Sequence, residues 1–269
     1  MNATTSSIVL APVSRLRVFM ALLRRDARVT RRELPSFLIR TTLQPLLFTT
    51  VFGFLLPSMG LVQGFYVSAL LPGILAISVS LASLQTVALP MVVEFGLGGE
   101  IEDRLLAPVP IELIAHEKLV VGVIQGILTA LFVFPLTRLI MGPVPGLTLA
   151  NGGTALAVLT LGAAAFSALG MVLGTAISPN RVSLLFSAII GPMMFFGCAY
   201  HPWHGLDRVP AMKIAVLANP LVYLSEGLRG TLTPGLPHMN LAIAMTVLGL
   251  IAAGFWALGI RTFARRAMR

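Results

Sequence analysis

Charged residues are scarce in this chain. Only 11% of the 269 residues are Asp, Glu, Lys or Arg, whereas 57% are hydrophobic. Soluble domains carry roughly 25% charged residues, so a soluble fold of this size would leave much of its surface apolar. The apolar runs extend from residue 36 to residue 261 and leave no stretch for a separate soluble domain. We therefore expect one membrane domain, residues 1–269, with lipid as the solvent for much of it.

Lysine is scarcer still, and this excludes a nucleotide-binding P-loop. That motif needs Gly-Lys followed by Ser or Thr, because the lysine reaches the nucleotide phosphates. The two lysines, Lys118 and Lys213, follow Glu117 and Met212 instead. His116-Glu117 begins a zinc-protease motif, but the second histidine of that motif is missing. We expect no catalytic residue and no cofactor in this chain.

Cys198 is the only cysteine, which excludes an intrachain disulfide. Together with His201 and His204 it has a spacing like that of metal ligands. A proline and a tryptophan intervene, however, and no carboxylate closer than Asp207 is available. We interpret the histidines as interfacial residues of an outer loop and expect no metal site.

Six apolar stretches have about the ~20 residues that a helix needs to cross the hydrocarbon core. The fourth is rich in glycine and alanine, and such small residues let helix backbones approach closely in lipid. We predict an all-α, polytopic membrane protein with six transmembrane helices. The predicted spans are 36–56, 66–93, 119–140, 154–177, 182–199 and 241–260.

Basic residues cluster before the first span and after the last one. Seven of the nineteen lie between Arg15 and Arg32, and four more close the chain from Arg261 onward. The loops 57–65 and 141–153 contain no charge, which fits the positive-inside rule if both termini are cytoplasmic. A nucleic-acid arm is an alternative, but basic clusters beside apolar spans are typical of membrane topology signals. We expect a multi-pass protein of the cytoplasmic membrane, with lipid and not nucleic acid as a partner.

Residues 16–32 have the periodicity of an amphipathic helix, with arginines on one arc and apolar residues on another. A basic amphipathic helix directly before a span is typical of the membrane interface. We predict an interfacial helix here. Packing against a soluble partner is the alternative, and both can hold for different residues. The arginines assigned to its polar face are Arg17, Arg24, Arg25 and Arg28.

Two segments depart from this pattern of spans and loops. Six of the ten acidic residues lie between Glu94 and Glu117, on the predicted cytoplasmic side. The outer segment 200–238 is too apolar for an ordinary loop and too rich in proline and glycine for a span. Irregular backbone at membrane depth survives only when it is buried in protein or lines a cavity. We therefore predict a pair of re-entrant half-helices within 200–238.

Glu226 and Arg229 lie three residues apart in this outer segment and would pair if it is helical. An unpaired charge buried near the membrane is costly, so we expect either this pairing or a water-filled cavity. The two residues either contact substrate or brace the re-entrant pieces, and bracing is the interpretation we favour.

In the acidic segment, Gly99 is followed by the acidic pair Glu102-Asp103, by Leu105-Leu106 and by Pro108 and Pro110. This order resembles the cytoplasmic loop of ABC type-2 exporter permeases, in which a glycine, an acidic pair and Leu-Leu lead into a turn that contains proline. Two further stretches match in order, Leu70-Leu71-Pro72-Gly73 and Asn219-Pro220-Leu221 with Tyr223, Glu226 and Arg229. The resemblance covers nearly the whole chain and is nearest to the drug-resistance and nodulation-factor export branch.

The resemblance implies a transport subunit and not an enzyme. Two such permeases, here expected to be a homodimer, would assemble with two copies of a separate ATPase subunit that binds ATP and Mg. ATP hydrolysis there would drive export of an amphipathic, drug-like or lipid-linked compound across the membrane. By the same resemblance, the interfacial helix would lie beside the ATPase.

The segment 98–110 would be the coupling helix that contacts the ATPase. Its acidic residues would stabilise the start of a short helix, while Ile101 and Leu105 would share one face and dock on the ATPase. An ordinary solvated loop is the alternative. Many relatives have threonine where Glu100 stands. The residues assigned to coupling are Gly99, Glu100, Ile101, Glu102, Asp103, Arg104 and Leu105.

Two other classes of function remain as alternatives. An ATP-independent secondary transporter or channel would need ionisable residues in mid-span, and most of the predicted spans have none in their central portions. A membrane scaffold without transport activity is the other. Candidates for lining a substrate route are Arg138, Phe132, Phe134, Phe195 and Phe196, and for the aromatic residues helix packing or lipid contact is the alternative.

Overall fold

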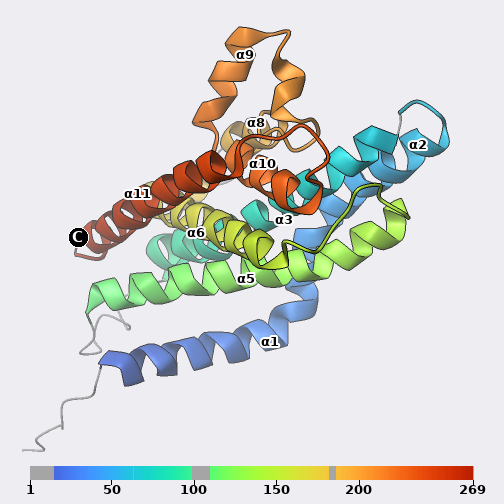
Figure 1. The fold of residues 1–269 in the computed structure, drawn as a ribbon. Coiled ribbons are helices and arrows are strands. Elements are labelled where there is room, and N and C mark those ends of the chain that lie inside the picture. Colours follow the sequence, from blue (N-terminus) through green and yellow to red (C-terminus); the bar gives the residue numbers. More distant parts are fainter. Residues whose placement is uncertain (1–14, 63, 99–109, 182–185, 269) are drawn as a thin grey trace, which may run out of the picture.

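The computed structural model describes residues 15–62, 64–98, 110–181 and 186–268. These residues form a bundle of long helices with a group of short helices near one edge (Figure 1). No strand occurs within the described ranges. The predicted all-α polytopic fold is therefore confirmed. The α-helices are α1 (Arg15–Phe48), α2 (Leu56–Ser58), α3 (Gly64–Val93), α5 (Ile111–Met141), α6 (Gly152–Ala176), α8 (Gly191–Phe195), α9 (Pro210–Ala215), α10 (Pro220–Leu232) and α11 (Leu241–Ala267).

Shorter helical turns of other types connect or extend these helices. The π-helical segments are Thr49–Leu55, Glu94–Gly98 and Phe186–Ile190, and the 3-10 segments are Pro179–Arg181, Trp203–Leu206 and Val216–Ala218.

Within the described parts of the chain, five helical segments are long and apolar enough to cross a membrane, and they coincide with five of the six predicted spans. Their bounds are Pro35–Ser58, Phe65–Gly96, Ile111–Met141, Gly152–Ala176 and Leu241–Ala267.

The remaining predicted span, 182–199, includes residues 182–185, which lie outside the described ranges. Pro179 lies against Gly96 near the end of α3, whereas Ala199 lies against Gly73 near its start. Pro179 and Ala199 therefore lie at two points far apart along α3. The total of six spans stays a prediction.

The predicted interfacial helix and the first span form one continuous helix, α1, with Pro35 and Pro45 inside it. The sequence predicts them as two elements, 16–32 and 36–56. A proline inside a helix removes a backbone hydrogen bond and often kinks it. In the structure the helix bends and continues (Figure 1). The four arginines assigned to the polar face of its first part are exposed. Their position in a membrane interface stays a prediction.

Helix α3 forms the centre of the bundle, and the apolar part of its span is buried throughout. It packs against α1, α5, α6 and α10. Its closest approach to α6 depends on glycine: a Cβ atom added at Gly170 would lie 2.5 Å from the carbonyl oxygen of Leu84. The prediction that small residues of the fourth span permit close packing is confirmed at this contact.

The start of α1 and the end of α11 lie at the same end of the bundle, on the left of Figure 1. The ring of Phe95, just after α3, meets that of Phe263 in α11 edge to face, with centroids 5.5 Å apart. The guanidinium of Arg266 donates to the carbonyl of Thr175 near the end of α6. We call this the basic end, and it contains the starts of α1 and α5 and the ends of α3, α6 and α11.

Candidate functional site

Helix α10 is completely buried although it contains two charged residues. It begins at Asn219, whose side-chain oxygen accepts a hydrogen bond from the backbone N–H of Leu221 at 3.0 Å. Pro220 follows at the first helical position, where its missing N–H is no loss. The amide nitrogen of Asn219 donates to the carbonyl of Met193 at 2.7 Å. Both polar ends of this asparagine are therefore used, one to cap α10 and one to attach it to α8.

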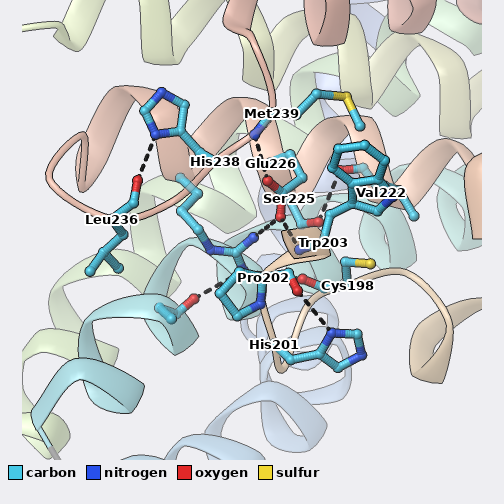
Figure 2. Close-up of polar contacts among 12 residues, drawn as sticks. Cys198, His201, Pro202, Trp203, Val222, Ser225, Glu226, Leu236, His238 and Met239 are labelled. Carbon is cyan, nitrogen blue, oxygen red and sulfur yellow. Dashed lines mark hydrogen bonds and ion pairs between the residues drawn. The ribbon is translucent and has the colours of Figure 1, made fainter. Parts of the chain in front are cut away.

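Glu226 and Arg229 form an ion pair, and neither side chain is exposed to solvent (0% for both). One carboxylate oxygen of Glu226 also accepts the backbone N–H of Trp203 at 2.8 Å (Figure 2). The other oxygen accepts the backbone N–H of Met239 at 2.8 Å. The pairing expected from the three-residue spacing is thus present, and the carboxylate has a partner on each oxygen.

Arg229 also connects α10 to α3 and to the segment before α9. One terminal nitrogen of its guanidinium donates to the carbonyls of Ala69 and Cys198, each at 3.1 Å. Its Nε has no hydrogen-bond partner among the described residues. Removing one member of a buried pair strands the other charge in a low-dielectric interior, so this network holds α10 firmly in place.

Further hydrogen bonds run from α10 and its surroundings to main-chain carbonyls. The hydroxyl of Tyr223 donates to Leu217 and that of Ser225 to Gly197, each at 2.8 Å. The indole N–H of Trp203 donates to the carbonyl of Lys213 at 3.1 Å. Because the polar groups of Glu226 are bound inside the protein, the geometry supports bracing over substrate contact for this pair.

The predicted re-entrant segment 200–238 contains two short helices, α9 and α10, joined by a single 3-10 turn. Their depth in the membrane stays a prediction. Cys198 is buried, His201 lies beside the carbonyl of Pro202 at 3.3 Å, and His204 lies 4.0 Å from Asp207. Across the described residues, no group of three or more His, Cys, Asp and Glu side chains is arranged to hold a metal ion.

An apolar cavity of about 430 Å³ lies between the segment that contains α8 and the segment 212–220. Its volume falls in the range of small-molecule sites, which are typically about 300–1,000 Å³. Of the residues proposed for a substrate route, Phe196 lines this cavity, whereas Phe132, Phe134, Arg138 and Phe195 are not among its lining residues. Asn219 is its one polar lining residue, and its side chain is already bonded within the protein. The lining residues are Ile189, Pro192, Met193, Phe196, Met212, Ala215, Val216, Ala218, Asn219 and Pro220.

A second buried charge cluster lies at the basic end, and we did not predict it from the sequence. The ammonium of Lys118 in α5 donates to the carboxylate of Glu94 at 3.0 Å and lies 3.9 Å from that of Asp26 in α1. A signal was available, because Glu94 and Lys118 lie just outside the two ends of the predicted coupling segment 98–110. The residues assigned to coupling, Gly99 to Leu105, lie outside the described residues.

A family model described as ABC-2 type transporter matches residues 17–233, which is more than half of the chain. Comparison with curated proteins and with solved structures found no significant match. The family is that of the membrane domain of ABC transporters, so the chain has a transport role and not a catalytic one, and an ATPase partner is implied. The ATP-independent alternative gives way to this assignment. The chain belongs to the ABC-2 type transporter family and is a multi-pass permease subunit of an ABC transporter.

Proposed function

We propose that this permease is an exporter that moves a hydrophobic or amphipathic compound out of the cytoplasm or between the membrane leaflets. It works as a homodimer with two copies of an ATPase subunit, which binds ATP and Mg. Hydrophobic drugs or antibiotics are the first substrate class, and lipid-linked saccharides the second. Both chain termini are placed on the cytoplasmic side of the cell membrane.

One observation carries the proposal: the two ends of the segment 98–110 are anchored at the basic end. The π-helical turn Glu94–Gly98 leads into this segment and α5 follows it. Because both terminal basic clusters belong to the same end of the bundle, the positive-inside rule assigns that end to the cytoplasm. The acidic segment is then available to a cytoplasmic ATPase, and its movement would reach α3 and α5 directly.

The apolar cavity supports the choice of substrate class. The lining is apolar except for Asn219, whose side chain is already hydrogen-bonded within the protein, so it suits the hydrocarbon part of an amphipathic molecule. Two flexible methionines, Met193 and Met212, contribute to the lining. Methionine adapts to ligands of different shape, as an exporter of several hydrophobic compounds would require.

The first experiment tests coupling in inside-out membrane vesicles that contain the permease and its ATPase. A double variant, Glu102→Gln with Asp103→Asn, should lose ATP-dependent uptake of a hydrophobic dye while the permease still inserts in the membrane. Glu112→Gln is the matched control, because Glu112 is an exposed acidic residue in the first turn of α5. Unchanged uptake and unchanged co-purification of the ATPase in the double variant would refute the coupling role.

A second experiment tests the cavity. Ala215→Trp should fill part of it and reduce dye uptake without preventing assembly with the ATPase. Ala211→Trp is the control, since Ala211 is exposed on the same helix, α9, but does not line the cavity. Equal uptake by the two variants would remove the cavity from the transport route.

A further inference from the structure

The charge cluster at the basic end joins three separate elements of the chain. Lys118 belongs to the early part of α5, Glu94 begins the π-helical turn after α3, and Asp26 belongs to α1. Their side chains are 10%, 9% and 18% exposed. Ion pairs with so little exposure are screened less by water and salt than pairs on an open surface. This cluster therefore links α1, α5 and the turn after α3 through specific charge pairs, at an end of the bundle that is otherwise rich in exposed arginines.

The residue types of this cluster are rare in the sequence around them. Lys118 is one of only two lysines in the chain, and Asp26 is the only acidic residue between Arg15 and Arg32. The neighbouring Arg24, Arg25 and Arg28 are exposed, whereas Asp26 is only partly so. The single acidic residue of the amphipathic helix is thus the one that faces α5.

The two links made by Lys118 differ in length. At 3.0 Å its ammonium is hydrogen-bonded to Glu94, which closes the base of the hairpin formed by α3, the segment 98–110 and α5. At 3.9 Å from Asp26 the attraction is that of two charges without a hydrogen bond. The hairpin link is therefore the firmer one, and the link to α1 is the one that separates first when the helices move.

We propose that Lys118 is a positioning residue that makes α1 follow the coupling segment. Glu94 and Lys118 keep the two ends of that segment together, so that a push from the ATPase moves α3 and α5 as one body. Asp26 then draws the basic helix with them. The inference rests on the proposed function, because it needs a motor that acts on the segment 98–110.

The test compares compounds transported per ATP hydrolysed in proteoliposomes that contain the permease and its ATPase. Asp26→Asn should preserve assembly and ATP hydrolysis but lower this ratio by about fivefold or more, the lower range of typical coupling between sites. Glu112→Gln, which removes an exposed carboxylate from the same end of α5, is the control and should keep the ratio of the unsubstituted protein. An Asp26→Asn variant with an unchanged ratio overturns the inference.

Charge exchange separates the two links. The double variant Glu94→Lys with Lys118→Glu restores the hairpin pair but places a carboxylate on α5 opposite that of Asp26, so it should assemble and yet transport poorly per ATP. Adding Asp26→Lys inverts all three charges and should recover the ratio. If the triple variant folds and assembles but transports no better than the double variant, the link to α1 is not electrostatic and the inference fails.

Failure of the proposed function has a different signature. If the unsubstituted permease shows no ATP-dependent transport with its ATPase, the exporter assignment falls regardless of any variant. If the unsubstituted permease transports normally, and the Asp26→Asn and charge-exchange variants transport as much per ATP as the Glu112→Gln control, the exporter assignment stands and the positioning role falls.

Discussion

The two buried charge clusters lie near opposite ends of α3 and are built from different kinds of partner. Ala69, which binds Arg229, and Glu94, which binds Lys118, are separated by roughly 37 Å along α3 at about 1.5 Å per residue. Around Glu226 and Arg229 every further hydrogen bond goes to a main-chain group. Around Lys118 the contacts are between side chains from three elements.

This difference indicates different mechanical roles. A main-chain group moves only when its helix or turn moves, so the network on α10 fixes neighbouring segments relative to one another. Side-chain partners separate by changes of rotamer, which cost far less than moving a packed helix. We interpret the α10 network as a static brace and the Lys118 cluster as a set of ion pairs that break and re-form when the helices shift.

The largest expected effect follows from breaking the brace. Arg229→Met leaves the carboxylate of Glu226 buried without its counter-charge, and we expect a loss of about 3–5 kcal/mol in the free energy of unfolding. The measurement is thermal unfolding of the purified permease in detergent, followed by circular dichroism.

A second variant separates charge burial from loss of packing. Adding Glu226→Gln to Arg229→Met removes the stranded charge, and the amide oxygen still accepts one of the two backbone N–H groups while the other loses its acceptor, so a part of the stability should return. Replacement of both members of a buried pair is often far less harmful than loss of one. A double variant as unstable as the single one would show that the arginine contributes through its main-chain bonds and not through its charge.

A smaller effect is expected at the basic end. Lys118→Met removes a hydrogen bond between charged groups, worth about 1.5–3 kcal/mol, and leaves two carboxylates near each other. Because both retain some access to water, the unfolding midpoint should fall less than in Arg229→Met. A larger fall than in Arg229→Met would reverse the comparison and make the Lys118 cluster the main structural support. Lys118→Arg keeps the charge and should fall between Lys118→Met and the unsubstituted protein.

Local spacing along the chain was enough to predict part of this arrangement. The spans follow from hydropathy, and the Glu226–Arg229 pair follows from helical geometry over three residues. The partners of Glu226 at Trp203 and Met239 are 23 and 13 residues away in sequence, and only the folded chain brings them together. Asp26 is further still from Lys118, and its contact depends on how α1 packs against α5.

The continuity of α1 across its prolines also depends on contacts beyond the local sequence. Proline is a local signal for the end of a helix, whereas the packing of α1 against α5 and α3 is a property of the whole bundle. Tertiary contacts outweigh the cost of the prolines, and the helix bends without ending. The path of residues 186–199 depends in the same way on contacts with α1 and α3.

The smallest effect concerns an ion pair that is exposed and not buried. Asp207 and Lys213 form a hydrogen bond beside α9, and the Lys213 ammonium lies 4.1 Å from the centroid of the Trp203 ring. The hydrogen bond from Lys213 lowers the pKa of the Asp207 carboxyl below its ordinary value of 3.8. A lowered pKa in the folded state means that the pair contributes stability above pH 3.8, and that this contribution is lost as the pH falls through the folded-state pKa.

Because Asp207 is exposed, we expect no measurable change in the unfolding midpoint of Asp207→Asn. The local change should still be visible in the fluorescence of Trp203, measured in a Trp256→Phe background since the chain has only these two tryptophans. Emission should change as the pH falls below 3.8, when Asp207 gains a proton and releases Lys213 from its position over the ring. Asp207→Asn should show the acidic emission already at neutral pH and lose the transition. A fluorescence transition that persists in Asp207→Asn would show that another group causes it. A large loss of stability in that variant would show that burial does not decide how much a charge pair stabilises this protein, and that its position in the fold does.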